Sequence, residues 1–113
     1  MQHKTLENGR WAKMPFLEQM ANIGSEVYRT SSWKMKGNSE RSRMAFERAL
    51  ELIDLTIKYG RLNEPGRNAM LEEVCRLREE FCKNYLSPDS NALTSFDKYF
   101  MQFAVAAARR RKI

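Results

Sequence analysis

The sequence predicts an all-α fold, an up-down-up-down antiparallel four-helix bundle. Three observations favour it: apolar residues recur at helical spacing in four segments, turn-forming residues separate these segments, and no stretch alternates as a strand does. Short connections between successive helices make neighbouring helices antiparallel, as in such bundles. With 113 residues, 42% of them hydrophobic and 30% charged, the chain suffices for one domain with a modest core.

The clearest helical pattern lies in residues 45–57, AFERALELIDLTI. Ala49 and Leu52 widen its apolar face, so this helix needs partners on both sides. Its outward positions are charged, which keeps that side in water. The large apolar residues of the face, spaced by four, three and four, are Phe46, Leu50, Ile53 and Ile57.

The preceding helix is predicted over residues 16–36. Gly24 lies in its middle, where it allows either a close approach of another helix or a kink. Gly37 is placed for a left-handed C-terminal cap, and Asn38 or Ser39 can cap the next helix. Because this connection is so short, the two helices should form an antiparallel hairpin.

A polar loop, residues 60–67, separates this hairpin from a third helix that begins near Asn68. Ser87 and Pro88 stop the third helix. Thr94 or Ser95 then begins the fourth helix, whose inward face carries several aromatic residues.

Several side chains are predicted to belong to the core. Cys75 and Cys82 are seven residues apart on one helix, a rise of about 10 Å and too far for a disulfide. They are therefore read as reduced core residues, with a redox pair as the alternative. Trp11 and Trp33 lie off the main helical stripes, so each either closes one end of the bundle or contacts a partner. The other residues placed in the core are Met20, Met44, Phe81 and Phe100.

Residues 1–15 are predicted to be a flexible basic N-terminal arm, residues 16–108 the bundle, and residues 109–113 a basic C-terminal tail. We expect a cytoplasmic protein without membrane contact, because no segment resembles a signal peptide and the longest apolar run, residues 103–108, is short. The net charge of +6 and the pI near 9.6 favour an anionic partner.

The basic residues should gather at the end of the bundle that holds both chain termini and the loop 60–67. Ten basic and two acidic residues there give a net charge of +8. Because the whole chain carries +6, the remaining residues sum to −2. Cations at helix C-termini also complement the helix dipole, and a trailing RRRK is compatible with a solvated tail, but dipole compensation needs only one or two charges. Arginine forks suit phosphates, so nucleic-acid backbone is the first candidate ligand. The predicted nucleic-acid-binding residues are Lys13, Lys58, Arg61, Arg67, Arg109, Arg110, Arg111 and Lys112.

The residues that most enzymes require are missing from the sequence pattern. His3 is the only histidine, which excludes histidine-based triads and histidine-rich metal sites. Glu47, Glu51 and Asp54 share a helical face, but no imidazole or second acidic helix completes a metal site, so a solvated face is the preferred interpretation. We expect no enzyme activity, no cofactor and no metal.

Five segments resemble those of short uncharacterised bacterial four-helix-bundle proteins. They are NIGSEV (22–27), Trp33 with residues 37–38, AFERALELIDLT (45–56), RLREE (76–80) and YFMQFAVAAAR (99–109). More distantly, length, helix order and basic charge are similar to two groups: the accessory variability determinant (Avd) of diversity-generating retroelements, and four-helix proteins encoded by ribosomal-RNA intervening sequences. In this comparison AFERALELIDLTI and LEEVCRLREEF occupy corresponding places.

The resemblance to Avd implies a homo-oligomeric, pentameric ring that binds template RNA and a reverse transcriptase. The first functional hypothesis is therefore a non-enzymatic nucleic-acid-binding accessory protein, with RNA favoured over DNA. The second is a protein–protein adaptor or homo-oligomeric scaffold whose basic end meets an acidic partner. The salt dependence of binding to random RNA and DNA distinguishes the two.

Overall fold

The computed structural model describes residues 5–60, 62 and 64–112, with side chains for residues 9–60, 62 and 64–111. Within these ranges the backbone forms five α-helices and no strand, so the predicted all-α class is confirmed. None of the helices described combines the length and apolar character needed to cross a bilayer. The helices are α1 (Thr5–Lys13), α2 (Phe16–Met35), α3 (Ser39–Tyr59), α4 (Asn68–Tyr85) and α5 (Ser95–Lys112).

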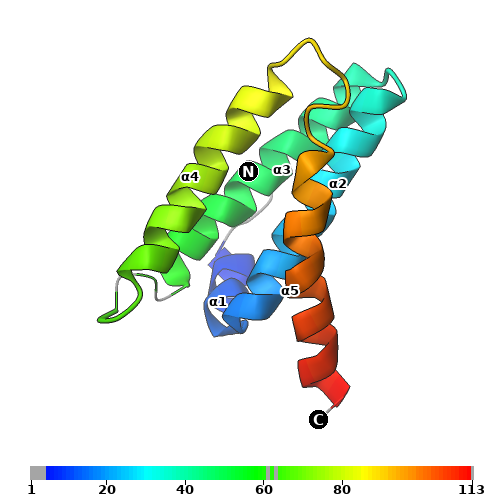
Figure 1. Ribbon diagram of the computed structural model, residues 1–113. Helices are drawn as coiled ribbons and strands as arrows, with labels where there is room; N and C mark the ends of the chain where they lie inside the picture. The colour runs from blue at the N-terminus through cyan, green and yellow to red at the C-terminus, as the bar shows by residue number, and fades with distance from the viewer. Residues whose placement is uncertain (1–4, 61, 63, 113) are drawn as a thin grey trace.

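Helices α2 and α3 form the predicted antiparallel hairpin (Figure 1). Gly37 adopts a φ of +79°, the left-handed conformation that glycine accepts without strain, and so ends α2. The side-chain oxygen of Asn38 then accepts a hydrogen bond of 3.0 Å from the backbone N–H of Arg41, which caps α3. Both turn predictions are confirmed.

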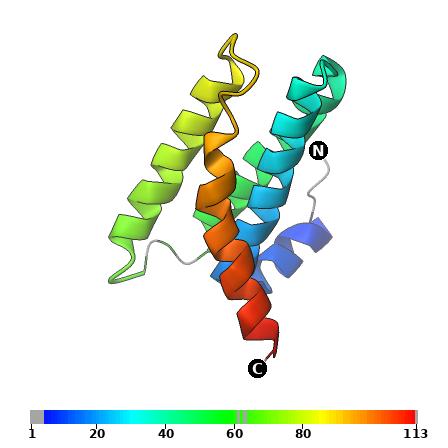
Figure 2. The same ribbon diagram turned by 45° about the vertical axis from the view of Figure 1, so that its right-hand side comes forward.

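The remaining helices pack around this hairpin. α5 lies against α2, whereas α4 and α1 contact α3. Figure 2 shows α4 and α5 close together where the loop joins them and diverging toward the other end. Aromatic rings fill this region, and Phe81 of α4 meets Phe96 of α5 edge-to-face, with ring centroids 6.2 Å apart.

The deepest side of α3 differs from the predicted one. Ala49 and Ile53 are fully buried and Ala45 nearly so, whereas Phe46 and Leu50 are only partly buried. The small alanines allow α3 to approach α2 closely, and the large side chains lie at the flank toward α4. There Phe46 stacks on Tyr85 of α4 with ring centroids 3.8 Å apart.

Three predicted core residues are confirmed and two are wrong. Met20, Phe81 and Phe100 are buried, but Met44 is 51% exposed and Cys75 is exposed. Cys82 is half-buried, and both cysteines are free thiols. The physical reason for the cysteine error is that α4 packs mainly on one neighbouring helix. Its buried stripe is therefore narrow, and comprises Val74, Leu77 and Phe81.

Gly24 allows the close helix contact that was one of its two predicted roles. A Cβ at this position would lie 2.7 Å from the Cβ of Phe100 and 2.9 Å from its ring. Such a separation is shorter than carbon atoms tolerate, so only glycine permits α5 to cross α2 at this distance.

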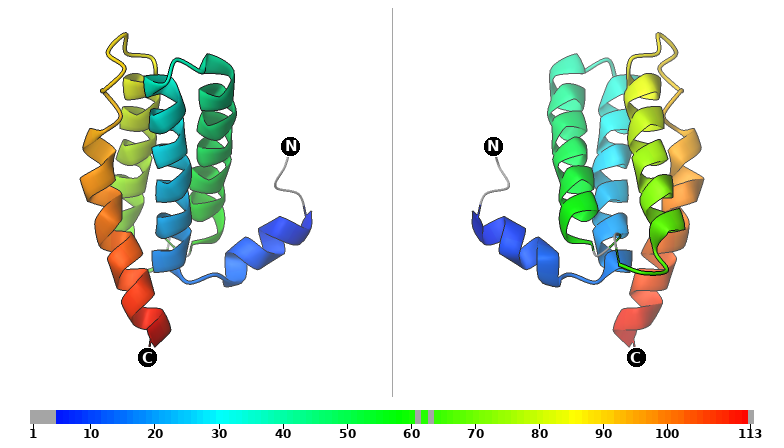
Figure 3. Two further views of the ribbon diagram at one scale, coloured as in Figure 1. Left: turned by 90° about the vertical axis from the view of Figure 1, so that its right-hand side faces the viewer. Right: turned by 90° about the vertical axis from the view of Figure 1, so that its left-hand side faces the viewer.

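Both ends of the chain contain more helix than the sequence predicts. Residues 5–13 of the predicted arm form α1, and Trp11 is only 6% exposed because it packs against α3. α5 continues to Lys112, so most of the predicted tail is helical. Figure 3 shows α1 projecting to one side of the other helices and the C-terminal turns of α5 extending beyond them.

Among the described residues, polar contacts connect α4 to α2, α3 and α5. The Lys34 ammonium of α2 donates to the backbone carbonyl of Tyr85 at the end of α4. Arg78 donates to Asp54 of α3 at 2.8 Å, and this hydrogen bond raises the pKa of the arginine. The Tyr99 hydroxyl of α5 donates to Glu73 at 2.7 Å. Burial, with a smaller contribution from Glu73, raises the pKa of Tyr99 well above its ordinary value.

We predict that Gly24→Ala destabilises the protein by about 1–2 kcal/mol, because overpacking outweighs the gain in helix propensity. Gly9→Ala is the matched control, since a Cβ at this helical position meets nothing within 4 Å. It should be neutral or slightly stabilising. Denaturant unfolding measures both, and a Gly24→Ala variant as stable as Gly9→Ala would contradict the close contact.

We also predict that Cys75 reacts with a thiol reagent in the native state, and that Cys82 reacts more slowly because it is half-buried. The single-cysteine variants Cys75→Ser and Cys82→Ser separate the two rates. Protection of Cys75 until the protein unfolds would mean that another surface covers this side of α4.

Candidate functional site

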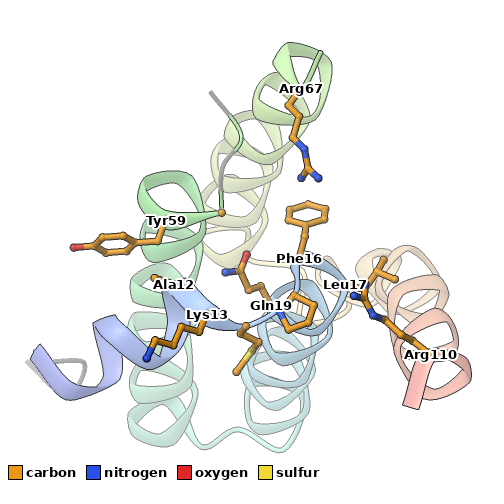
Figure 4. A pocket seen from close by; sticks show the side chains of 11 residues that line it. Ala12, Lys13, Phe16, Leu17, Gln19, Tyr59, Arg67 and Arg110 are labelled. Carbon is orange, nitrogen blue, oxygen red and sulfur yellow. The ribbon is translucent and has the colours of Figure 1, made fainter. Parts of the chain in front are cut away.

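A cleft of about 640 Å³ lies where α1 ends, α2 begins and α3 meets the loop to α4 (Figure 4). Eleven residues line it, and they come from α1, α2, α3, the loop and the last turns of α5. None of the eleven is acidic. Segments far apart in the sequence thus meet at one hollow surface.

Three cations border the cleft, each from a different part of the chain. Lys13 is the last residue of α1, Arg67 immediately precedes α4, and Arg110 lies in the last turns of α5. All three side chains are exposed. Figure 4 shows them extending from separate elements around the hollow. The surrounding field therefore favours an anion.

The first turn of α2 adds hydrogen-bond donors to the same cleft. Pro15 precedes the helix and supplies no side-chain cap. Among the described residues, the N–H groups of Phe16 and Leu17 have no hydrogen-bond partner, and both residues line the cleft. Because a helix N-terminus carries a partial positive charge, it also attracts anions.

Gln19 lies at the inner wall of the cleft and is 1% exposed. Its amide N–H donates to the carbonyl oxygen of Trp11 at 2.9 Å, which fixes the orientation of the amide. The amide oxygen, Oε1, has no hydrogen-bond partner within the described structure. Gly60 leaves room beside it, since a Cβ there would lie 3.1 Å from this oxygen and closer still to the carbonyl of Thr56.

The other predicted site residues lie near the cleft or outside the described part of the chain. Lys58 is exposed, with its ammonium 5.2 Å from the centre of the Tyr59 ring. Arg109 is exposed, and Arg111 pairs with Glu18 of α2 at 3.3 Å. Arg61 and the side chain of Lys112 lie outside the described residues. We name this region the basic end; its described cations are Lys13, Lys58, Arg67, Arg109, Arg110 and Arg111.

Residues that the sequence analysis did not select also contribute. Nothing in the sequence marks Gln19 and Gly60 as site residues. Gln19 resembles an ordinary helical residue, and Gly60 resembles an ordinary loop glycine. Their roles depend on the position of α1 over the start of α2. A further clue was available in Pro15, whose place before an uncapped helix already indicates free N–H groups.

A second charged surface surrounds Trp33 on α2 and α3. The Lys36 ammonium lies 5.1 Å, and the Arg41 guanidinium 4.9 Å, from the centre of the half-buried Trp33 ring. Glu26 and Glu40 also line this surface, so its charge is mixed. Of the two predicted alternatives, Trp11 is thus a core residue, whereas Trp33 remains partly open to a partner.

The three cations that border the cleft favour an anion. Its described lining residues include no carboxylate, imidazole or thiol. Across the part of the chain described, no group of three or more histidine, cysteine, aspartate and glutamate residues is placed to hold a metal ion.

No protein-family model, curated protein sequence or solved structure matches this chain.

We predict that Trp11→Phe destabilises the protein by about 1–3 kcal/mol. The indole N–H donates to the Thr56 hydroxyl at 3.1 Å in a buried site, and the smaller ring loses this bond and leaves a void. Trp33→Phe is the control and should change stability by only about 0.5 kcal/mol, because Trp33 is partly exposed. Equal losses in denaturant unfolding would show that α1 contributes no specific stability.

Proposed function

We infer that this chain is a non-enzymatic nucleic-acid-binding accessory protein. In this proposal α2–α5 form an up-down-up-down four-helix bundle whose basic end binds the phosphate backbone. The observation that carries it is that Lys13, Arg67 and Arg110, from three separate elements, border one cleft whose described lining residues include none that is acidic.

The distribution of arginine–carboxylate ion pairs supports the basic end as the phosphate-binding region. In the body of the protein, four arginines pair with carboxylates: Arg29 and Arg48 with Glu26, Arg43 with Glu47, and Arg78 with Asp54. At the basic end only Arg111 has such a pair, and Lys13, Arg67, Arg109 and Arg110 have no carboxylate partner among the described residues. Unpaired cations need no internal contact to be broken before they bind a phosphate.

The same observations favour backbone contacts over base recognition. Arginine guanidinium groups form paired hydrogen bonds with phosphate oxygens, and such contacts position a protein without reading the sequence. The C-terminal turns of α5, which extend past the other helices, present Arg109, Arg110 and Arg111 without an intervening aromatic residue. Binding should therefore depend strongly on salt and little on sequence.

The resemblance to Avd extends the proposal. On that basis the protein is a cytoplasmic, pentameric component of a diversity-generating retroelement, where it binds template RNA rather than DNA together with a reverse transcriptase. Its support is the similarity in length, helix order and basic charge. Specific capture of a reverse transcriptase by the purified chain tests this part of the proposal, and its absence would leave only the nucleic-acid-binding part.

We predict that replacing Arg109, Arg110, Arg111 and Lys112 with serine flattens the salt dependence of RNA binding. Each lost phosphate contact should lower the slope of log affinity against log salt by about 0.7–0.9. Stability should change little, because the three described side chains are exposed.

The matched control replaces Arg43, Arg76, Lys83 and Lys98 with serine. It removes the same charge from exposed positions away from the basic end. Its slope should remain close to that of the unmodified protein. If both variants lose the same slope, overall charge alone attracts RNA; if neither does, an adaptor with an acidic protein partner becomes the better account.

A further inference from the structure

We propose that the cleft binds a terminal phosphate monoester of a ribonucleotide, at a strand end or in a free nucleotide, in preference to an internal phosphodiester. This inference rests on the proposed function, because it assigns a specific ligand to part of the basic end. This ligand differs from the nucleic-acid backbone in general, because a single terminal phosphate would occupy a defined position in the cleft.

The charge of the cleft matches a monoester better than a diester. A monoester carries a charge of about −1.5 to −2 near neutral pH and offers three acceptor oxygens. An internal phosphodiester carries a single negative charge. Lys13, Arg67 and Arg110 provide three cations, and no acidic side chain offsets them among the lining residues that the structure describes.

The start of α2 supplies directional donors for such a group. Phe16 and Leu17, whose N–H groups have no partner in the described structure, line the cleft at the positive end of a helix of 20 residues. Cations alone would attract a phosphate loosely from any direction. Backbone donors held by a helix fix the position of its oxygens.

Gln19 gives an independent indication that a ligand enters the cleft. Its Oε1 atom is buried, has no partner in the described structure and accepts hydrogen bonds only. Exchanging the amide oxygen and nitrogen would not satisfy the oxygen, because the N–H must face the Trp11 carbonyl. An unsatisfied buried acceptor is costly, so a donor is expected here.

A phosphate dianion cannot supply that donor, but a hydroxyl on the same ligand can. Ribose carries hydroxyl groups within a few bonds of its 5′-phosphate. The cleft thus combines anion binding at Lys13, Arg67 and Arg110 with one neutral acceptor at its inner wall. That combination fits a ribonucleotide 5′-phosphate better than inorganic phosphate.

The test compares the binding of three short oligonucleotides of one sequence to the full chain at constant salt. They are RNA with a 5′-phosphate, RNA with a 5′-hydroxyl, and DNA with a 5′-phosphate. The phosphorylated RNA should bind about tenfold more tightly than the hydroxyl RNA, and several-fold more tightly than the DNA. Competition with adenosine 5′-monophosphate and with inorganic phosphate separates a strand end from a free nucleotide.

The variant Lys13→Ser, Arg67→Ser, Arg110→Ser should abolish the preference for the 5′-phosphate. The control Arg76→Ser, Lys83→Ser, Lys98→Ser removes equal charge elsewhere and should keep it. Equal affinity of the unmodified protein for the first two RNAs overturns the proposal without any variant. In that case salt-dependent binding of both RNAs still supports the proposed function, whereas failure of every oligonucleotide to bind rejects both.

Discussion

The structure depends on how closely other helices can approach α2. On one side Gly24 admits Phe100 of α5 at a distance that any Cβ would prevent. On the other side the Ser42 hydroxyl of α3 donates to the backbone carbonyl of Thr30 at 2.8 Å, which requires the two helices to lie nearly in backbone contact. Because α3 and α5 both pack on α2, and α4 contacts both α3 and α5, the spacing around α2 also affects where α4 lies.

That spacing also determines what lies at the basic end. The first turn of α2 forms part of the cleft, and α5 brings Arg110 to it only because α5 crosses α2 at Gly24. The pair between Arg111 and Glu18 reinforces the same alignment at the surface, although an exposed pair contributes little stability. A packing constraint in the middle of the protein thereby places a charged group near its end.

The sequence predicts what local rules control. Gly37 and Asn38 identify the hairpin because left-handed backbone and helix capping are properties of one or two residues. The sequence predicts less well which face of a helix is most deeply buried, because burial depends on the neighbouring helices against which that helix packs. Cys75 lies beside a buried valine on α4, and only the single-sided packing of that helix leaves the thiol exposed. Similarly, the concentration of cations at one end follows from composition and helix order, whereas the cleft depends on a helix, α1, whose sequence shows no clear period.

Gln19 links the position of α1 to the ligand proposed for the cleft. Its amide N–H donates to the carbonyl of Trp11, and the same residue lines the cleft. Coupling of this kind is reciprocal: if docking of α1 strengthens binding in the cleft by some factor, an occupied cleft strengthens docking by the same factor. Release of α1 would then weaken ligand binding in two ways, through the loss of Lys13 from the cleft and through the freed amide of Gln19.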